Sequence, residues 1–401
     1  MNLDFPQALL LLGGLLAVAA ALSGWLNASV LSISVLAVVA GIVLAAFDVV
    51  SVEPGSAIVE HVVELALIVT LFSDGLLVER ELLARQWGPP ARALVLAMPL
   101  TLALLGAIGL VLFPSLTVSE CFLLAAVLTP TDPVVTSTVV TATRVPALVR
   151  HTLNLESGLN DGLALPFVLF FLTLAEPGGN AASSALELLG KVGVGALIGV
   201  ALAFVGGRAL QRLPGGGIAR NYEGVYSLGL ALFAYGLASV TWANGLIAAF
   251  VAGIALGVAE HDIPKAFSQF NESVSAALQV GVFFLFGALV VATGWDHGVL
   301  PLIAFIAFAL LVARPLAVLA SLTGTRLSSP VRLFVSWFGP KGVASMLFAL
   351  LVLRSEAPHA TFVFEIASFA ILSSIVAHGL TDTVGTRWIE ARLQRVQAPA
   401  G

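Results

Sequence analysis

The stretch ESGLNDG at residues 156–162 opens the apolar segment LALPFVLFFLTL at residues 163–174. Glu156 and Asn160 are four residues apart, so they share one face of a helix, and Asp161 lies one step round from Asn160. An ionisable side chain at membrane depth is costly, and it marks an ion pathway or a proton relay. The stretch therefore predicts a functional polar site on a helix, provided that the segment lies in a membrane.

The composition indicates a membrane protein. Hydrophobic residues make up 59% of the 401 positions and charged residues only 10%, whereas soluble globular chains have about 25% charged residues. Apolar runs of about 20 residues recur along the chain, and each could cross a hydrocarbon core of about 30 Å. A β-barrel would show short alternating segments instead. The single cysteine, Cys121, excludes an internal disulfide and a thiolate metal cluster. We expect an all-α polytopic membrane protein.

Hydropathy and helix breakers predict 13 membrane spans within a single transmembrane domain, residues 1–401, that ends in a short cytoplasmic tail at 386–401. The approximate spans are 8–26, 29–47, 57–78, 93–113, 118–141, 152–174, 186–207, 222–239, 242–259, 271–294, 298–322, 331–353 and 361–385.

Basic residues indicate how these spans are oriented. Fourteen of the 18 lysines and arginines fall in the loops after odd-numbered spans or in the tail. They are Arg80, Arg85, Arg92, Arg144, Arg150, Arg208, Arg212, Arg220, Lys265, Arg326, Arg332, Arg387, Arg392 and Arg395. Because cytoplasmic loops carry an excess of lysine and arginine, we expect the N-terminus outside and the C-terminus in the cytoplasm.

Two predicted spans are interrupted. The fifth contains TPTDP at residues 129–133, and the twelfth contains GPKG at residues 339–342. Proline breaks a helix, and unwound backbone at membrane depth survives only where it is buried in protein or lines a cavity. The breaks are fifth in spans one to six and fifth in spans eight to thirteen. This position predicts two inverted six-helix repeats, at about 8–174 and 222–385, joined by a linking helix at about 186–207.

The two breaks and the sixth span should meet in one polar site. Its members would be Asp132, Glu156, Asn160, Asp161 and Lys341, with neutral oxygens from Ser157 and Thr131. Hard cations prefer oxygen ligands. An ammonium group can keep one buried acid ionised, and we expect Glu156 to pair with Lys341. Asp161 would then be free to bind either a proton or a metal cation. Asp132 could coordinate the cation, cap the half-helix after its break, or do both.

One carboxylate with two mutually exclusive occupants predicts an antiporter that exchanges one proton for one monovalent cation without net charge movement. The motifs Thr131-Asp132-Pro133, Glu156-Ser157-x-x-Asn160-Asp161-Gly162 and Gly-x-Lys-Gly resemble those of monovalent cation:proton antiporters of the NhaP and sodium/proton-exchanger type. The resemblance covers essentially the whole chain.

The resemblance implies an NhaA-like antiporter fold, with broken helices that cross at mid-membrane. It implies that Asp161 binds cation and proton, that Asp132, Ser157 and the Thr131 carbonyl complete the cation site, and that Asn160 orients it. Glu156 would be held by the basic residue of the twelfth span. The family usually has Gly-Leu-Arg-Gly there, whereas this chain has Gly-Pro-Lys-Gly. The resemblance also implies a homodimer in the plasma (inner) membrane, transport of sodium, lithium or potassium, and no cofactor.

Other functions and roles remain open. A potassium/proton antiporter would use the same mechanism. A cation channel would need a continuous pore, a sodium-coupled symporter would need more polar groups for an organic solute, and an intramembrane enzyme would need a catalytic motif that the sequence lacks. We expect no enzyme activity, no nucleic-acid partner and no organic substrate. Asp74 could be a water-facing cap or part of an entry funnel, and Arg314 a bundle ion pair or interface group.

Overall fold

The computed structural model describes residues 5–26, 33–53, 56–76, 88–132, 147–178, 181–212, 219, 222–259, 265–325 and 327–397. All regular secondary structure in these ranges is helical, which confirms the predicted helical class. Pro133 and the remainder of the fifth predicted span lie outside the described residues, as do Arg80, Arg85, Arg144, Arg220 and Arg326.

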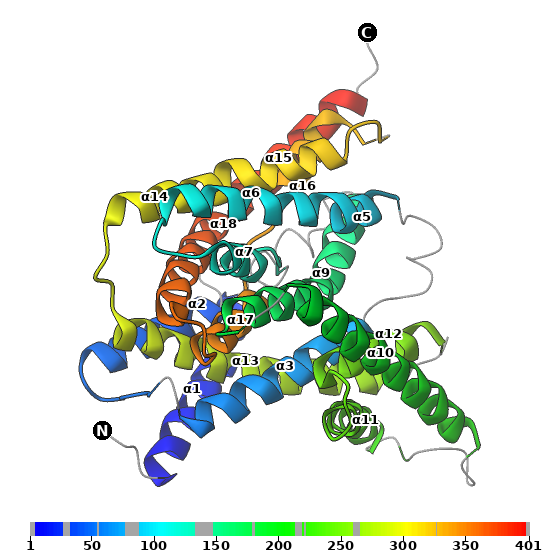
Figure 1. The fold of residues 1–401 in the computed structure, drawn as a ribbon. Helices are drawn as coiled ribbons and strands as arrows, with labels where there is room; N and C mark the ends of the chain where they lie inside the picture. Colours follow the sequence, from blue (N-terminus) through cyan, green and yellow to red (C-terminus); the bar gives the residue numbers. More distant parts are fainter. Residues whose placement is uncertain are drawn as a thin grey trace.

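The helices follow one another along the chain as Figure 1 shows. They are α1 (Phe5–Leu26), α2 (Ile33–Ala46), α3 (Ala57–Leu76), α5 (Gly88–Arg92), the π-helix η1 (Ala93–Ala97), α6 (Met98–Leu112), α7 (Val118–Val127), α9 (Ala147–Ala175), α10 (Ala181–Arg212), α11 (Glu223–Ser239), α12 (Gly245–Ala259), α13 (Lys265–Thr293), α14 (Val299–Phe308), the π-helix η4 (Ala309–Ala313), α15 (Arg314–Ser321), α16 (Ser329–Trp337), α17 (Val343–Leu353) and α18 (Ala360–Gln397).

Six helical segments of the described chain are each long and apolar enough to cross a membrane. They are Gly88–Leu112, Leu155–Ala175, Ala185–Arg208, Gln269–Thr293, Val299–Ser321 and Ala360–Leu393. Shorter apolar helices, such as α7 and α17, coincide with the two interrupted spans of the sequence analysis. The boundary between α11 and α12 is a turn that ends at Asn244, whose side-chain oxygen accepts a hydrogen bond from Ile247 N at 3.0 Å and so caps α12.

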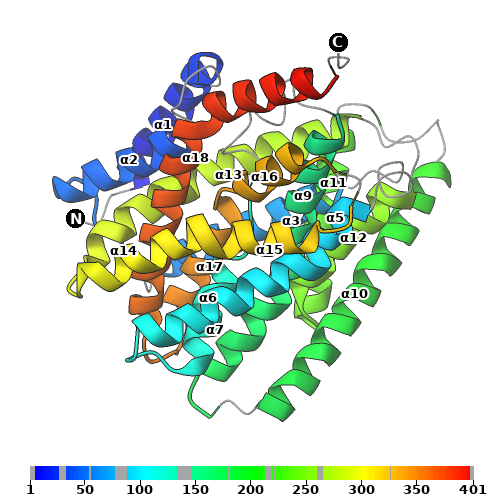
Figure 2. The ribbon, with the colours of Figure 1, turned by 90° about the horizontal axis from the view of Figure 1, so that it is seen from above.

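The helices pack as two groups. The first comprises α1 to α3 and α10 to α13, in which α2 packs against α13 and α3 against α12. The second comprises α5 to α9 and α14 to α18, in which α7 packs against α6 and α9, and α15 against η1. Figure 1 shows α3, α11 and α13 in the lower part of the molecule and α6, α14 and α15 in the upper part. Seen from above, α15 runs beside α6 (Figure 2).

Both predicted helix breaks are present. The helix α7 ends at Val127, and the residues from Leu128 to Asp132 are not helical. The second break separates α16 from α17 by a non-helical link, Phe338–Gly342. Proline removes a backbone donor, and both breaks contain one, at Pro130 and Pro340.

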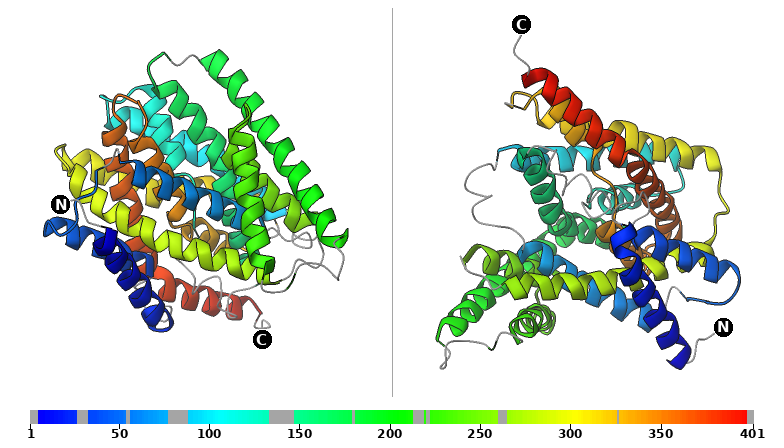
Figure 3. Two further views of the ribbon diagram at one scale, coloured as in Figure 1. Left: turned by 90° about the horizontal axis from the view of Figure 1, so that it is seen from below. Right: turned by 180° about the vertical axis from the view of Figure 1, so that it is seen from behind.

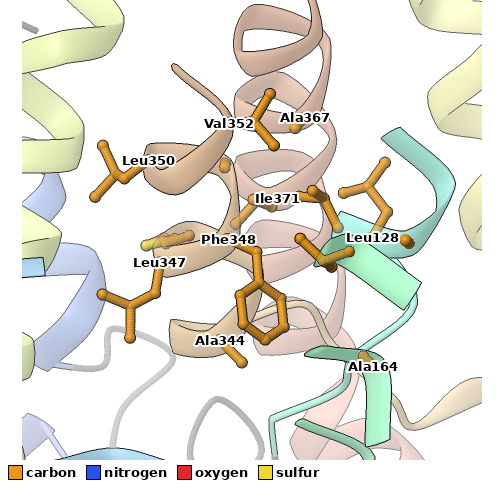
Figure 4. Packing of buried hydrophobic residues seen from close by; sticks show 14 of the residues in the cluster. Leu128, Ala164, Ala344, Leu347, Phe348, Leu350, Val352, Ala367 and Ile371 are labelled. Carbon is orange, nitrogen blue, oxygen red and sulfur yellow. The ribbon is translucent and has the colours of Figure 1, made fainter. Parts of the chain in front are cut away.

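The centre of the second group is tightly packed. Phe348 and Leu347 on α17 and Ile371 on α18 are fully buried, and Figure 4 shows them together with Leu128 beyond the end of α7 and Ala164 on α9. In a membrane, such helix packing is driven by close van der Waals contact rather than by the exclusion of water. The packing holds α7, α9, α17 and α18 around the two breaks.

The helix α18 is longer than the thirteenth predicted span. It continues to Gln397, through most of the segment that was expected to be a short tail. Ile389 on this extension is buried in one hydrophobic cluster with Phe334 and Phe338 of the α16 region and Val149 of α9. Figure 3 shows the C-terminal end of α18 reaching the edge of the molecule.

Candidate functional site

The two breaks cross at the centre of the second helix group. Asp132 N donates a hydrogen bond to Pro340 O at 2.9 Å, so the backbone of one break is tied to that of the other. The amide of Val343, the first residue of α17, donates to Asp132 Oδ2 at 3.0 Å. Lys341 Nζ lies 3.4 Å from Thr129 O and 3.3 Å from Pro130 O. Each break therefore supplies a charged side chain to the other.

Asp132 caps α17, the helix that follows the second break. Its carboxylate accepts from the N-terminus of α17, where the helix dipole favours a negative charge. Gly342 makes this approach possible, because a Cβ at that position would overlap the Asp132 side chain. The half-helix that the sequence analysis expected Asp132 to cap, after its own break, lies outside the described residues.

Lys341 makes the reciprocal contact. Its ammonium group donates to carbonyls just beyond the C-terminal end of α7, where the helix dipole favours a positive charge. The side chain is 4% exposed, so these carbonyls are the neighbours that offset the loss of water. The contact ties the second break to the backbone of the first.

The prediction that Glu156 pairs with Lys341 was wrong. Glu156 Oε1 accepts a hydrogen bond from Arg314 Nη1 at 2.8 Å, and both side chains are more than nine-tenths buried. The same guanidinium donates from Nη2 to Phe338 O at 3.3 Å, within the second break. Arginine presents several donors in a planar fork, which allows it to hold a carboxylate and a carbonyl at once.

The first break is also held by α9. Asn160 Nδ2 donates to Thr131 Oγ1 at 2.6 Å, and the Ser157 hydroxyl donates to the Thr131 carbonyl. These side chains lie on neighbouring positions of one helix face, as their spacing predicted. A carbonyl has two lone pairs, so the hydrogen bond from Ser157 leaves Thr131 O able to accept a second partner.

Asp161 is buried on the same helix, with 7% of its surface exposed. Its Oδ1 atom has no hydrogen-bond partner among the described residues, and neither has Asn160 Oδ1 beside it. The charges of Asp74, Asp132 and Lys341 all act on the Asp161 carboxylate. Buried polar atoms are almost always hydrogen-bonded, so these two bare oxygens mark a place where a ligand or a proton can bind.

Asp74 on α3 brings the first helix group to this place. Its Oδ2 atom is likewise buried without a hydrogen-bond partner in the described part of the chain. The backbone of α3 passes close to α9 here, since a Cβ on Gly158 would lie 3.7 Å from Asp74 O. Asp74 therefore lies where α3 packs against α9, at the boundary between the two helix groups.

A small cavity adjoins the crossing and is lined by Thr131, Asp132, Glu156, Ser157 and Pro340, among others. It has room for about one water molecule. Its polar walls come from the fifth, sixth and twelfth predicted spans, which the sequence analysis had brought together from the two breaks and the ESGLNDG stretch.

Sequence reasoning missed one set of polar groups near the crossing. Ser374, His378 and Thr381 lie on one face of α18, and each contacts α16 or the link that follows it. Their spacing of four and three residues within an apolar span was the signal that could have identified them.

Comparisons with known proteins match the chain over most of its length. The sequence profile for the transmembrane sodium/hydrogen exchanger family matches residues 12–385. Over 343 residues the chain is 24% identical to the K(+)/H(+) antiporter NhaP of Alkalimonas amylolytica. The aligned region covers 84% of this chain and 58% of that protein. Over 363 residues the chain is 26% identical to a probable Na(+)/H(+) antiporter of Schizosaccharomyces pombe, with 80% and 47% covered. The chain spans about half the length of the curated relatives that it matches.

The fold is also that of a solved structure. The sodium proton antiporter MjNhaP1 from Methanocaldococcus jannaschii at pH 8 matches with a TM-score of 0.79 at 21% identity, over 97% of this chain and 98% of that one. The profile match extends from the first predicted span to the last and includes every residue of the crossing described above. The chain belongs to the transmembrane sodium/hydrogen exchanger family.

Proposed function

We propose that this protein is a secondary antiporter that exchanges a monovalent cation for a proton across the plasma membrane, with Asp161 as the group that binds both in turn. The observation that carries the proposal is that both basic side chains at the crossing have other partners, whereas Asp161 has no ion-pair partner among the described residues. Arg314 is engaged by Glu156, and Lys341 by two carbonyls. Among the ion pairs of the described residues, none includes Asp161, whose Oδ1 atom lacks a partner.

A buried carboxylate in this position favours either of two occupants. Desolvation disfavours the bare charge, so the group binds a proton or a cation. One carboxylate that exchanges one proton for one monovalent cation moves no net charge. Asp132, Ser157, Asn160 and the Thr131 carbonyl would contribute oxygen ligands, which hard cations prefer. No resident cofactor is needed for this exchange.

Asp74 adds an acid from the first helix group. Its bare Oδ2 atom and its electrostatic effect on Asp161 support a place on the cation's route between the groups. If the two groups rock against each other, as in alternating access, the cation would be exposed to one side of the membrane at a time. Closure of the boundary between the two helix groups would bring Asp74 of α3 and Asp161 of α9 together.

The transported ion is proposed as sodium, lithium or potassium. The relatives named above include a K(+)/H(+) antiporter and a probable Na(+)/H(+) antiporter, and each name describes that protein alone. Sodium and potassium both suit a site of carboxylate, amide, hydroxyl and carbonyl oxygens. A potassium/proton antiporter with the same mechanism is therefore the second candidate.

The proposed architecture is a single domain of 13 spans with two inverted repeats, at about 8–174 and 222–385. Two features support the repeats. The broken helices are the fifth span of each half, and the fourth span of each half contains a π-helix directly before an X-Pro pair, Met98-Pro99 and Arg314-Pro315. The contacts are reciprocal, since α15 packs on η1 and α6 packs on η4. We further propose a homodimer, with the N-terminus outside and the C-terminus in the cytoplasm.

The proposal is tested by proton flux in everted membrane vesicles, followed with a pH-sensitive dye after pulses of lithium, sodium or potassium chloride. The parent protein should show saturable, cation-dependent proton movement, and Asp161→Asn should abolish it while leaving the amount of inserted protein unchanged. The matched control is Glu187→Gln, which changes an acid in an exposed pair with Lys191 on α10. Parent-like flux in Asp161→Asn, or no flux with any of the three ions in the parent, would contradict the proposal.

A further inference from the structure

The link between α16 and α17 leaves several backbone groups without helical partners. Backbone polar groups buried at membrane depth must be satisfied within the protein. Phe338 O accepts from Arg314, and Pro340 O accepts from Asp132 N. Two further backbone groups at the ends of the link are the carbonyl of Trp337 and the amide of Lys341.

Both of these groups are held by α18. Lys341 N donates to Ser374 Oγ at 2.9 Å, and His378 Nε2 lies 2.9 Å from Trp337 O. Trp337 is also held through its side chain, because its indole Nε1 donates to Thr381 Oγ1 at 3.0 Å. The link is therefore fixed at both ends by one face of a continuous helix.

These contacts are buried and connected to each other. Ser374 is fully buried and His378 is 2% exposed. His378 Nδ1 lies 2.7 Å from the Ser374 carbonyl oxygen and 3.2 Å from Ser374 Oγ, the hydroxyl oxygen that accepts from Lys341 N. With the proton on Nε2, the imidazole donates to Trp337 O, so the ring joins α18 to the end of α16.

We propose that Ser374 and His378 are positioning residues that set where Lys341 and the N-terminus of α17 lie relative to Asp132. The inference rests on the proposed antiport function. The link contains Gly339, Pro340 and Gly342, and helix-type hydrogen bonds tie only its end residues, Phe338 and Gly342, to the flanking helices. The helix α18 is continuous past both ends of the link, so it provides the rigid reference that the link lacks.

The consequence is an effect on cation affinity without direct contact with the cation. If the link moves along α18, the ammonium of Lys341 leaves the carbonyls of Thr129 and Pro130, and the amide of Val343 leaves Asp132. Both movements change the charge and the ligand geometry around Asp161. Positioning of this kind alters the apparent KM for the cation more than the maximal rate of exchange.

The test compares Ser374→Ala and His378→Leu in the vesicle assay, with KM and maximal rate measured for the cation that the parent transports best. Each variant should raise the apparent KM by about tenfold, the order expected when a buried hydrogen-bond partner is removed. His378→Gln should restore most of the parent KM, because a glutamine Nε2 can donate to Trp337 O in place of the imidazole. Ser374→Thr keeps the hydroxyl and should behave likewise.

The matched control is Ser368→Ala on the same helix. Ser368 is fully buried, and its hydroxyl has no hydrogen-bond partner among the described residues, so its removal should leave the KM unchanged. A parent-like KM in Ser374→Ala, or a loss of stability in Ser374→Ala and His378→Leu with no change of KM, would overturn the positioning role. Should His378→Leu not fold, Ser374→Ala decides alone, since it removes one hydroxyl. Failure of the antiport function itself would appear differently, as absence of flux in the parent.

Discussion

The guanidinium of Arg314 donates a hydrogen bond to the carboxylate of Glu156 at 2.8 Å, although the two residues lie 158 positions apart in the chain. The contact joins α15 to α9 and, through Phe338 O, to the second helix break. Arg314 directly follows the π-helix Ala309–Ala313, a type of helix distortion that is frequent at functional sites. The site thus uses two basic residues: Arg314 pairs with Glu156, and Lys341 binds carbonyls beyond the end of α7.

Arg314→Met should destabilise the protein by about 3–5 kcal/mol, because it leaves the Glu156 carboxylate buried without a counter-charge. Thermal unfolding of the purified protein in detergent measures the effect. The double variant Glu156→Gln with Arg314→Met should recover most of the loss, since it removes both charges. Combining Lys341→Met with Glu156→Gln should not give this recovery of stability, because Lys341 is not the partner of Glu156. Equal stability of Arg314→Met and the parent would contradict the structural importance of the pair.

Asp132→Asn and Asp132→Ala should separate helix capping from cation binding. The amide oxygen of asparagine can still accept from Val343 N, so Asp132→Asn should remain near the parent in thermal stability and lose exchange. Asp132→Ala should lose exchange and also about 1 kcal/mol of stability, the usual effect of removing an N-cap. Thermal unfolding and vesicle flux measured on both variants provide the comparison. Exchange at the parent rate in Asp132→Asn would show that this carboxylate only caps.

Gly342→Ala should disrupt the crossing. The added methyl would overlap the Asp132 side chain, and overpacking of this kind costs about 1–3 kcal/mol. Flux and thermal stability should therefore both fall. Gly13→Ala on α1 is the control, because a Cβ there would meet no atom within 4 Å. If both variants kept parent flux and stability, the close approach of the two breaks could not be as the structure has it.

Glu120→Ala should weaken the start of α7 without touching the site. The Glu120 carboxylate is fully buried and accepts from Thr117 N at 2.8 Å and from His359 N at 3.0 Å, so it joins the beginnings of α7 and α18. Removing it takes the charged acceptor from two backbone amides, and the stability should fall by about 1–3 kcal/mol. The partly exposed Ser119→Ala is the control. The folded fraction of Glu120→Ala should keep the parent KM, in contrast to Ser374→Ala.

The local features of the site were predictable from the sequence because they are encoded by neighbouring residues. Proline at positions 130 and 340 removes a backbone donor whatever surrounds it, and both helices are broken there. The spacing of Ser157, Asn160 and Asp161 fixes which side chains share a helix face. Hydropathy likewise indicated the helical membrane class, while the 13-span count and the inverted repeats stay predictions.

The partners of the charged groups were decided only by the tertiary structure. Arg314 and Lys341 both lie within predicted spans, so either could have been the partner of Glu156. Nothing in the sequence favours Arg314 over Lys341. Asp132 caps a helix that begins 211 residues later, and Ser374 holds a backbone amide 33 residues away. Such contacts depend on distances between helices, which arise from the packing of many apolar side chains at once. Residue spacing along one helix carries no information about them.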